Sequence, residues 1–107
     1  MARIHIETYC HTKRVSRGDG AFVRRAIEEH WSDKEPVVLD FDGVRIASVS
    51  FFDETLGLLA RKHDLETLKL HVKVENIDPA DRRLLNRIVL ARAKERQMDA
   101  SEDATQR

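Results

Sequence analysis

Residues 37–56 read VVLDFDGVRIASVSFFDETL, and the organisation of the whole chain follows from them. They begin with an apolar run directly after Pro36, pass through two aspartates and a glycine, and reach serines that can start a helix. Residues 37–41 have too little polarity for a strand with one face in water, so we expect a central strand that is covered on both faces. The other elements should pack around this strand.

The composition is typical of a soluble, single-domain protein with a heavily charged surface. The chain has 107 residues, of which 41% are hydrophobic and 36% are charged, and this length suits one domain. Nineteen basic and nineteen acidic residues cancel, so no overall field attracts nucleic acid or an anionic membrane. Cys10 is the single cysteine, which leaves no internal disulfide. Without a signal peptide or an apolar run of about 20 residues, we expect a soluble, cytoplasmic protein.

Alternation and capping signals predict the elements on either side of the central strand. Residues 3–9 alternate between apolar and polar side chains, which indicates a half-buried first strand. Apolar residues then recur at helical spacing, and Ser16 or Asp19 can cap this first helix. A second helix should begin at Ser50, which can form a loose capping box with Asp53.

Residues 68–75 carry the clearest alternation in the chain. Leucine and valine alternate there with lysine, histidine and glutamate, so we expect a third strand with one face in water. Asp78 and Pro79 then predict the start of a third helix, with Asp78 as its cap and Pro79 at its first position. The apolar pattern of this helix continues to about Gln97.

The predicted order is strand, helix, strand, helix, strand, helix. Strands separated by helices pair in parallel through right-handed crossovers, so we expect a small α/β domain with a mostly parallel or mixed sheet and about three helices. We assign residues 1–97 to this domain and residues 98–107, which are small, polar and acidic, to a flexible C-terminal tail. Because the first and third strands alternate, part of the sheet should be open or covered by a partner.

The segment Asp40-Phe41-Asp42-Gly43-Val44, directly after an apolar run, resembles the catalytic pair of the haloacid dehalogenase superfamily. In that superfamily one carboxylate attacks phosphorus, the second handles the proton, and a metal ion holds the phosphate. Those enzymes also need a hydroxyl residue at the end of a later strand, a lysine and a further acidic pair, whereas here the next strand ends in Glu75-Asn76. We therefore interpret Asp40 and Asp42 as turn residues whose carboxylates accept nearby amides. A small phosphatase that uses both aspartates is the alternative.

Several short motifs follow one another between residues 37 and 54. They are an apolar strand ending in aspartate, a polar turn with glycine, and serines that open a helix, namely Val37-Val38-Leu39-Asp40, Asp42-Gly43-Val44, and Ser48-Val49-Ser50 before Phe51-Phe52-Asp53-Glu54. Together with Ser16-Arg17-Gly18-Asp19-Gly20 at the first helix, they resemble the STAS domain of anti-sigma-factor antagonists, and more closely its STAS-like branch of unknown function. The resemblance covers about residues 3–95 in element order and implies a protein-binding domain without catalysis.

The resemblance also implies a switch at the start of the second helix. In the antagonist family a serine at this place is phosphorylated by a histidine-kinase-like ATPase, and phosphorylation dissolves the complex. Ser50 matches this position and Ser48 is the second candidate, although Val49 and Phe51 stand where the antagonists have a small polar residue and glycine. A phosphate there would add nearly two negative charges beside Asp53. Serine is also a favoured helix cap, so a purely structural role for Ser50 stays open.

The other candidate sites have ordinary structural explanations. His5, Cys10 and His11 match no common metal-site spacing, and His5 and His71 should lie solvated on the wet faces of strands, so we expect neither a metal nor a cofactor. Between Arg82 and Arg96 six basic residues stand against one acid, Glu95, and we interpret them as a solvated helix face because aromatic residues for stacking on nucleic acid are absent nearby. They are Arg82, Arg83, Arg87, Arg92, Lys94 and Arg96.

We therefore predict a non-catalytic STAS-like protein–protein interaction module in bacterial regulation, with partner switching controlled by serine phosphorylation. Its partner-binding surface should be formed by Asp42, Ser48, Ser50 and Asp53. The expected partner is another protein, and the resemblance suggests a histidine-kinase-like ATPase. Binding to nucleic acid or to a membrane is not expected. A structural module that forms homodimers through the open sheet face is a further alternative.

Overall fold

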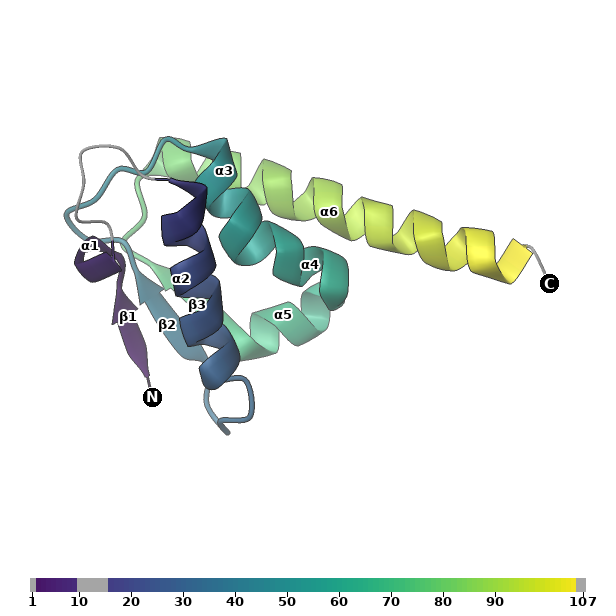
Figure 1. Cartoon of the computed structure of the whole chain (residues 1–107), viewed down its shortest axis with the longest axis horizontal. Helices are drawn as coiled ribbons and strands as arrows, with labels where there is room; N and C mark the ends of the chain where they lie inside the picture. The colour runs from purple at the N-terminus through teal and green to yellow at the C-terminus, as the bar shows by residue number, and fades with distance from the viewer. Residues whose placement is uncertain (1, 10–15, 106–107) are drawn as a thin grey trace.

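The apolar run of residues 37–41 supplies the middle strand of a three-stranded parallel sheet (Figure 1). The structure is a computed structural model and describes residues 2–9 and 16–105. The strands lie in the order β1-β2-β3, so the predicted α/β class with a parallel sheet is confirmed. The elements in chain order are β1 (Arg3–His5), α1 (Ile6–Tyr9), α2 (Arg17–Glu29), β2 (Val37–Asp40), α3 (Val49–Phe52), the π-helical turn η1 (Asp53–Gly57), α4 (Leu58–Lys62), α5 (Leu65–His71), β3 (Val72–Glu75) and α6 (Pro79–Thr105).

β2 is buried along its whole length, as its composition predicted. Leu39 is inaccessible to solvent and pairs with Ile4 of β1 on one side and with Val74 of β3 on the other. This row faces the hydrophobic core, where it meets apolar side chains of the helices. The central position of this strand is therefore confirmed.

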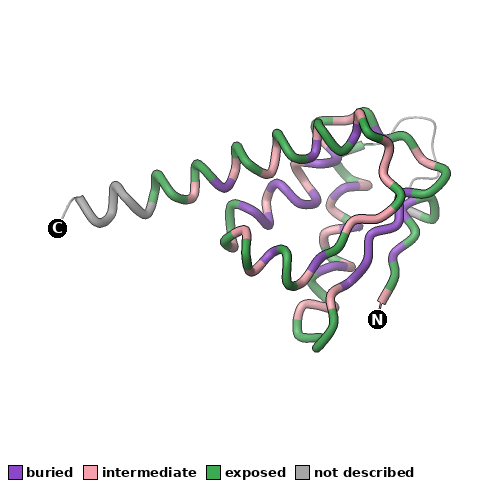
Figure 2. The backbone as a smooth tube through the Cα atoms, turned by 180° about the vertical axis from the view of Figure 1, so that it is seen from behind, coloured by how far each residue is buried: buried purple, intermediate pink, exposed green. Residues whose placement is uncertain are grey.

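Most side chains on the other face of the sheet are polar, and Val38 of β2, which is 1% exposed, is an apolar exception. Because neighbouring residues of a strand point to opposite faces, the residues beside Ile4, Leu39 and Val74 point away from the core. The side chains of Arg3, His5 and Glu75 on this face are between 41% and 61% exposed. In Figure 1 α2 lies in front of the strands, and Figure 2, seen from behind, shows the strands on the near side. The alternation in the sequence thus identified the polar face of β1 and β3.

The third strand is shorter than its alternation indicated. Asp64 accepts the Thr67 N–H at 2.7 Å and so caps α5, which occupies the first half of the predicted strand. In this helix Leu68 is buried, whereas Leu70 is 73% exposed. The prediction of a strand over residues 68–71 is therefore wrong, because a short capped helix can bury one leucine and leave the other in water.

The boundaries of the first strand and the last helix also differ from the predictions. β1 ends at His5 and the chain turns at once into α1, so the predicted strand over residues 3–9 is too long. Asp78 accepts a backbone N–H two residues later at 2.9 Å, which caps α6 as predicted. This helix continues to Thr105, so its predicted end at about Gln97 is wrong. The extra turns contain neither glycine nor proline to break a helix, and the flexibility of the tail stays a prediction.

α3, η1 and α4 form one continuous helix that packs between β2 and α6. Gly57 lies in its π-helical turn, where a Cβ atom would come within 2.7 Å of Oδ1 of Asp53 and 3.1 Å of Cγ2 of Ile88. The missing side chain allows α6 to approach closely. Phe52 is fully buried, and its ring centroid lies 6.1 Å from that of Phe41 at the end of β2. This packing fixes the start of the helix beside the central strand, where the predicted site lies.

Candidate functional site

The four residues of the predicted binding surface follow one another along the segment that leaves the carboxyl end of β2. Asp42 is exposed in the loop between β2 and α3. Ser48 and Ser50 are half-buried at the start of α3, and Asp53 begins the π-helical turn. Val49, between the serines, is 59% exposed, so the first turn of this helix is open to solvent.

Ser48 caps this helix, and Ser50 does not. The Ser48 Oγ accepts the Phe51 N–H at 3.2 Å, and the Ser48 carbonyl accepts the Phe52 N–H at 3.3 Å. Ser50 is the second residue of α3, and its hydroxyl makes no hydrogen bond within residues 2–9 and 16–105. The predicted capping box of Ser50 and Asp53 is therefore wrong. Both serines have the chemistry of a cap, and only the path of the backbone decided between them.

A buried carboxylate from α6 holds the loop in front of Ser48. Asp81 is 2% exposed and accepts the Ile46 N–H at 2.6 Å and the Ala47 N–H at 2.8 Å. Ala47 has a φ of 48°, in the left-handed region that residues with a side chain rarely adopt, and the two hydrogen bonds stabilise this conformation. The sequence analysis missed Asp81. Its only signal is an acidic residue in the first turn of a helix, which is favourable there without any distant contact.

Three arginines neutralise the acidic residues of the next turn. Arg92 binds Asp53 in a bidentate ion pair, with both N–O distances 2.7 Å, and these hydrogen bonds lower the pKa of Asp53. Arg17 and Arg24 bind Glu54 at 2.8 Å and 2.7 Å and lower the pKa of Glu54 in the same way. Asp53 therefore faces α6, and its side chain is only 15% exposed. Arg92, which was predicted on the solvated face of the last helix, is instead a partner of this acid.

Replacing Arg92 with alanine is expected to remove part of the pH dependence of stability. The folded-state pKa of Asp53 lies below its ordinary value of 3.8. The ion pair therefore stabilises the fold fully above that pH, and the stabilisation is lost as the pH falls further through the lower folded-state pKa. The free energy of unfolding of Arg92→Ala should be lower than that of wild type by about 1–3 kcal/mol at neutral pH. The difference should approach zero in acid, where Asp53 is protonated in both proteins.

Urea denaturation of both proteins at several pH values measures this effect. Arg87→Ala is the matched control, because Arg87 is an exposed arginine of the same helix without an ion pair among the described residues. It should leave the free energy of unfolding nearly unchanged at every pH. A destabilisation by Arg92→Ala that is the same at acid and neutral pH would mean that the arginine acts through packing alone.

Asp40 is held in a hydrogen-bond network at the carboxyl end of the sheet. Its Oδ1 accepts from the Asn76 amide and from the Asp42 backbone N–H, both at 3.0 Å, and its Oδ2 accepts from Arg3 at 2.9 Å. These bonds, with that from Asn76 the largest contribution, lower the pKa of Asp40. His5 lies nearby, with its Nδ1 3.6 Å from Oδ2. The interpretation of Asp40 as a turn residue that accepts a neighbouring amide is confirmed.

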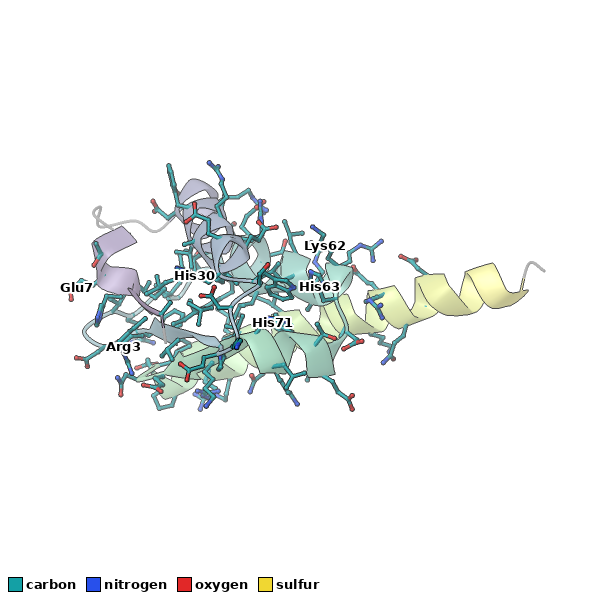
Figure 3. The ribbon with its side chains drawn as sticks, turned by 90° about the horizontal axis from the view of Figure 1, so that it is seen from below. Arg3, Glu7, His30, Lys62, His63 and His71 are labelled. Carbon is teal, nitrogen blue, oxygen red and sulfur yellow. The ribbon has the colours of Figure 1, made fainter. Side chains whose placement is uncertain are left out.

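His5 lies on the exposed face of β1 as predicted, whereas His71 does not lie in a strand. His71 ends α5 and stacks on Trp31, with ring centroids 4.1 Å apart, so its predicted place on a wet strand face is wrong. His63 also stacks on Trp31, and desolvation by burial lowers the pKa of His63. Figure 3 labels both His63 and His71. Cys10 and His11 lie outside the described residues. Among the residues that the structure does describe, no group of three or more His, Cys, Asp or Glu side chains could hold a metal ion.

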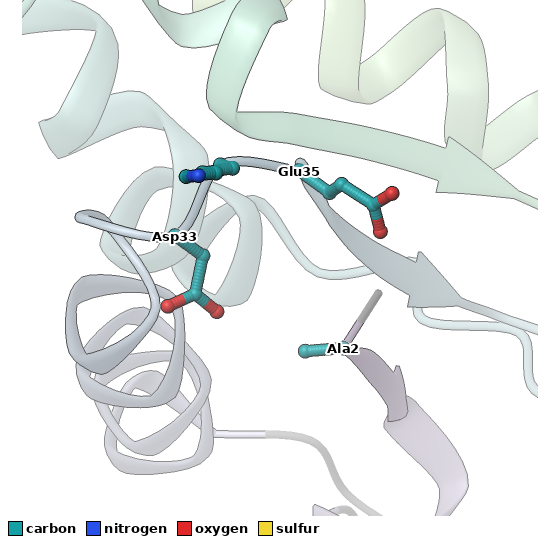
Figure 4. Close-up of a pocket in the computed structure, with 4 residues that line it drawn as sticks. Ala2, Asp33 and Glu35 are labelled. Atoms are coloured by element: carbon teal, nitrogen blue, oxygen red, sulfur yellow. The ribbon is translucent and has the colours of Figure 1, made fainter.

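A hollow of about 390 Å³ lies at the amino ends of the strands, away from the predicted binding surface. It is lined by Ala2, before β1, and by Asp33, Lys34 and Glu35, in the turn before β2 (Figure 4). The predicted site follows the carboxyl end of β2, so the two places are separated by the length of the strand. None of the four predicted binding residues lines this hollow.

Comparison with known protein families gives one match. A family model described as a STAS-like domain of unknown function (DUF4325) matches residues 19–82, more than half of the chain. No curated protein and no solved structure matches. The matched segment includes β2, β3 and all four residues of the predicted binding surface. Within residues 2–9 and 16–105, no helix combines the length and the apolar composition needed to cross a bilayer.

Proposed function

The chain belongs to the family of STAS-like domains of unknown function, and from this premise we propose that it is a non-catalytic docking module in bacterial regulation. Its partner is a protein in the cytoplasm, and phosphorylation of Ser50 switches the binding. The binding surface is the loop and first helical turn that contain Asp42, Ser48 and Ser50. Asp53 supports this surface through its ion pair with Arg92.

The position of Ser50 is the observation that carries this proposal. Its side chain is half-buried in the first turn of a helix that begins at the surface. Its hydroxyl is unbonded within the described part of the chain, because Ser48 serves as the cap. A kinase could therefore modify Ser50 without removing the hydrogen bond that starts the helix.

A phosphate on Ser50 would compete for an arginine that now holds two helices together. Glu54 follows Ser50 by four residues on the same helix, which places the two side chains on one side, and Arg17 of α2 binds Glu54 at 2.8 Å. A phosphoserine carries about 1.5–2 negative charges and three acceptor oxygens, so it would attract Arg17 away from Glu54. The charge and the shape of the surface between α2 and α3 would change together, and a partner would respond to both.

The network around Asp40 supports docking over the phosphatase alternative. Both oxygens of this carboxylate already accept hydrogen bonds from Asn76, Asp42 and Arg3, so a nucleophilic Asp40 would first have to leave its partners. Magnesium-dependent hydrolysis of p-nitrophenyl phosphate that is lost in Asp40→Asn would establish the phosphatase instead.

Phosphorylation in vitro tests the proposal. The protein is incubated with ATP and a histidine-kinase-like ATPase from the same cell, and modified peptides are mapped by mass spectrometry. We expect a phosphate on Ser50 in wild type and none in Ser50→Ala. Ser32→Ala, which removes an exposed serine in the turn before β2, should be modified as wild type is. Absence of phosphate from both Ser48 and Ser50 would contradict the proposal that phosphorylation switches binding.

Recovery of partners from the native cell tests the docking role separately. Wild type, Ser50→Asp and Ser32→Asp are used as bait, and the last of these adds the same charge away from the helix. A partner that is captured by wild type and Ser32→Asp and lost with Ser50→Asp is the expected result. Equal capture by all three proteins would place the partner on another surface.

A further inference from the structure

An apolar groove lies between β3, α5 and α6, and it shares no residue with the surface around Ser50. Its volume is about 200 Å³. Seven of its lining residues are leucine or valine, and the polar ones are Lys69, Arg82 and Asn86. The apolar residues are Leu56, Leu65, Leu68, Val72, Val74, Leu85 and Val89.

One wall of this groove is a strand with an unpaired edge. Among the strands that the structure describes, β3 is the last of the sheet and pairs with β2 alone. The Glu75 carbonyl accepts the Phe41 N–H at 3.0 Å, so the backbone of Glu75 faces β2, and the backbone groups of Val74, one residue earlier, face the opposite way. The Arg82 guanidinium, 3.4 Å from the Val74 carbonyl, lies on this free side. An added strand would find the Val74 N–H there, and it would replace Arg82, which donates a hydrogen bond to the Val74 carbonyl, so that Arg82 becomes free to pair with a carboxylate.

The volume of the groove suits side chains better than a small molecule. Pockets for drug-sized ligands and cofactors usually measure about 300–1,000 Å³, and this groove is smaller. In an extended segment every second side chain points to the same side. A strand added at β3 would therefore direct alternate side chains into the groove, and a few of valine or leucine size would fill it.

The charges at the groove favour an acidic occupant. Lys69 and Arg82 are exposed, and neither forms an ion pair with any described residue. None of the described residues that line the groove is an aspartate or a glutamate. Lys69 and Arg82 have long, exposed side chains at the groove, so they can reach a carboxylate on a neighbouring position of a bound segment that itself points out of the groove. Such complementary charges guide association and fix the register.

We propose that β3 and this groove bind an extended segment of a partner protein in which apolar side chains alternate with acidic ones. The segment adds a fourth strand at the free edge of β3, its apolar side chains enter the groove, and its carboxylates pair with Lys69 and Arg82. This site is separate from the serine-controlled surface and does not depend on phosphorylation, so the domain has two docking surfaces.

A labelled peptide tests this site directly. The probe is a fluorescein-labelled heptapeptide with valine or leucine at the second, fourth and sixth positions and glutamate at the others, and binding is measured by fluorescence anisotropy. The double variant Lys69→Glu/Arg82→Glu should bind it about tenfold more weakly or worse, and should gain affinity for the same peptide with lysine in place of glutamate. Arg87→Glu, which makes a similar charge change outside the groove, should bind the acidic peptide as wild type does.

A second variant separates strand addition from simple charge attraction. Val74→Pro removes an N–H that faces the free edge and leaves the bonds to β2 intact, so it should weaken binding while both cations remain. Equal binding of a peptide with the same composition but with its apolar residues adjacent would overturn the proposal. So would equal losses in Arg87→Glu and in the double variant, or no binding to wild type. A homodimer detected by light scattering and abolished by Lys69→Glu/Arg82→Glu would show that the occupant is a second copy of the chain, which also overturns it.

Discussion

The free energy of unfolding of Asp81→Ala is expected to fall by about 2–5 kcal/mol, because a buried donor that loses its acceptor costs about 1–3 kcal/mol. Asp81 is 2% exposed and accepts two backbone N–H groups, those of Ile46 and Ala47. Alanine would leave both donors without an acceptor and would release Ala47 from its left-handed conformation. The loop before Ser48 should lose its fixed path, so the start of α3 should loosen as well.

Urea denaturation of three proteins checks this prediction. Asp78→Ala is the control, because Asp78 accepts a single N–H at the same end of α6 and is not buried, so its loss should cost about 0.5–2 kcal/mol. Asp81→Asn keeps one acceptor oxygen and should fall between the two. If Asp81→Ala were no less stable than Asp78→Ala, the carboxylate would be acting only at the helix terminus and not on the loop.

The free energy of unfolding of Gly20→Ala is expected to fall by about 1–3 kcal/mol, as overpacking does in other tightly packed positions. A Cβ atom at Gly20 would lie 2.7 Å from the Phe51 carbonyl oxygen and 2.9 Å from Cβ of Glu54. Both neighbours belong to the helix that starts at Ser48, so α2 and that helix would have to move apart. The movement would also disturb the ion pair between Arg17 and Glu54.

Gly18→Ala is the matched control for this effect. Gly18 lies in the same helical turn, where a Cβ atom would lie 3.5 Å from the Ser16 hydroxyl oxygen, an ordinary contact. Alanine is the better helix former by up to about 1 kcal/mol, so Gly18→Ala should leave stability unchanged or raise it. Thermal or urea unfolding of both variants decides the point. Similar changes in both would indicate that helix propensity, and not the approach of α2 to α3, determines the role of Gly20.

Features that depend on neighbouring residues were predictable from the sequence. The burial of β2 follows from the apolar side chains of residues 37–41 themselves. The cap of α2 could also be predicted, because Ser16 and Asp19 bind each other's backbone N–H at 3.2 Å and 2.9 Å within one turn. The Asp78-Pro79 start of α6 is a signal of the same local kind.

Where two local structures fit the same residues, the sequence did not decide between them or predicted the wrong one. The alternation over residues 68–71 fits a strand, yet the cap at Asp64 and the burial of Leu68 favour α5. Ser48 and Ser50 are equally suited to cap a helix, and the loop held by Asp81 places Ser48 at that position. In both cases the competing structures have similar local free energies, so tertiary packing decides between them.

The sequence by itself therefore determined the class of the fold and its central strand, and the place of the binding surface stays a prediction. Only the tertiary structure decided which distant charges meet, such as Asp81 with the loop at Ile46 and Arg92 with Asp53. More than a third of the residues are charged, so the sequence offers many possible arginine or lysine partners for each acidic residue. The ion pairs are determined when α6 packs its apolar side against the helix after β2, because this burial brings particular charged side chains within reach of one another. No short stretch of sequence specifies this packing.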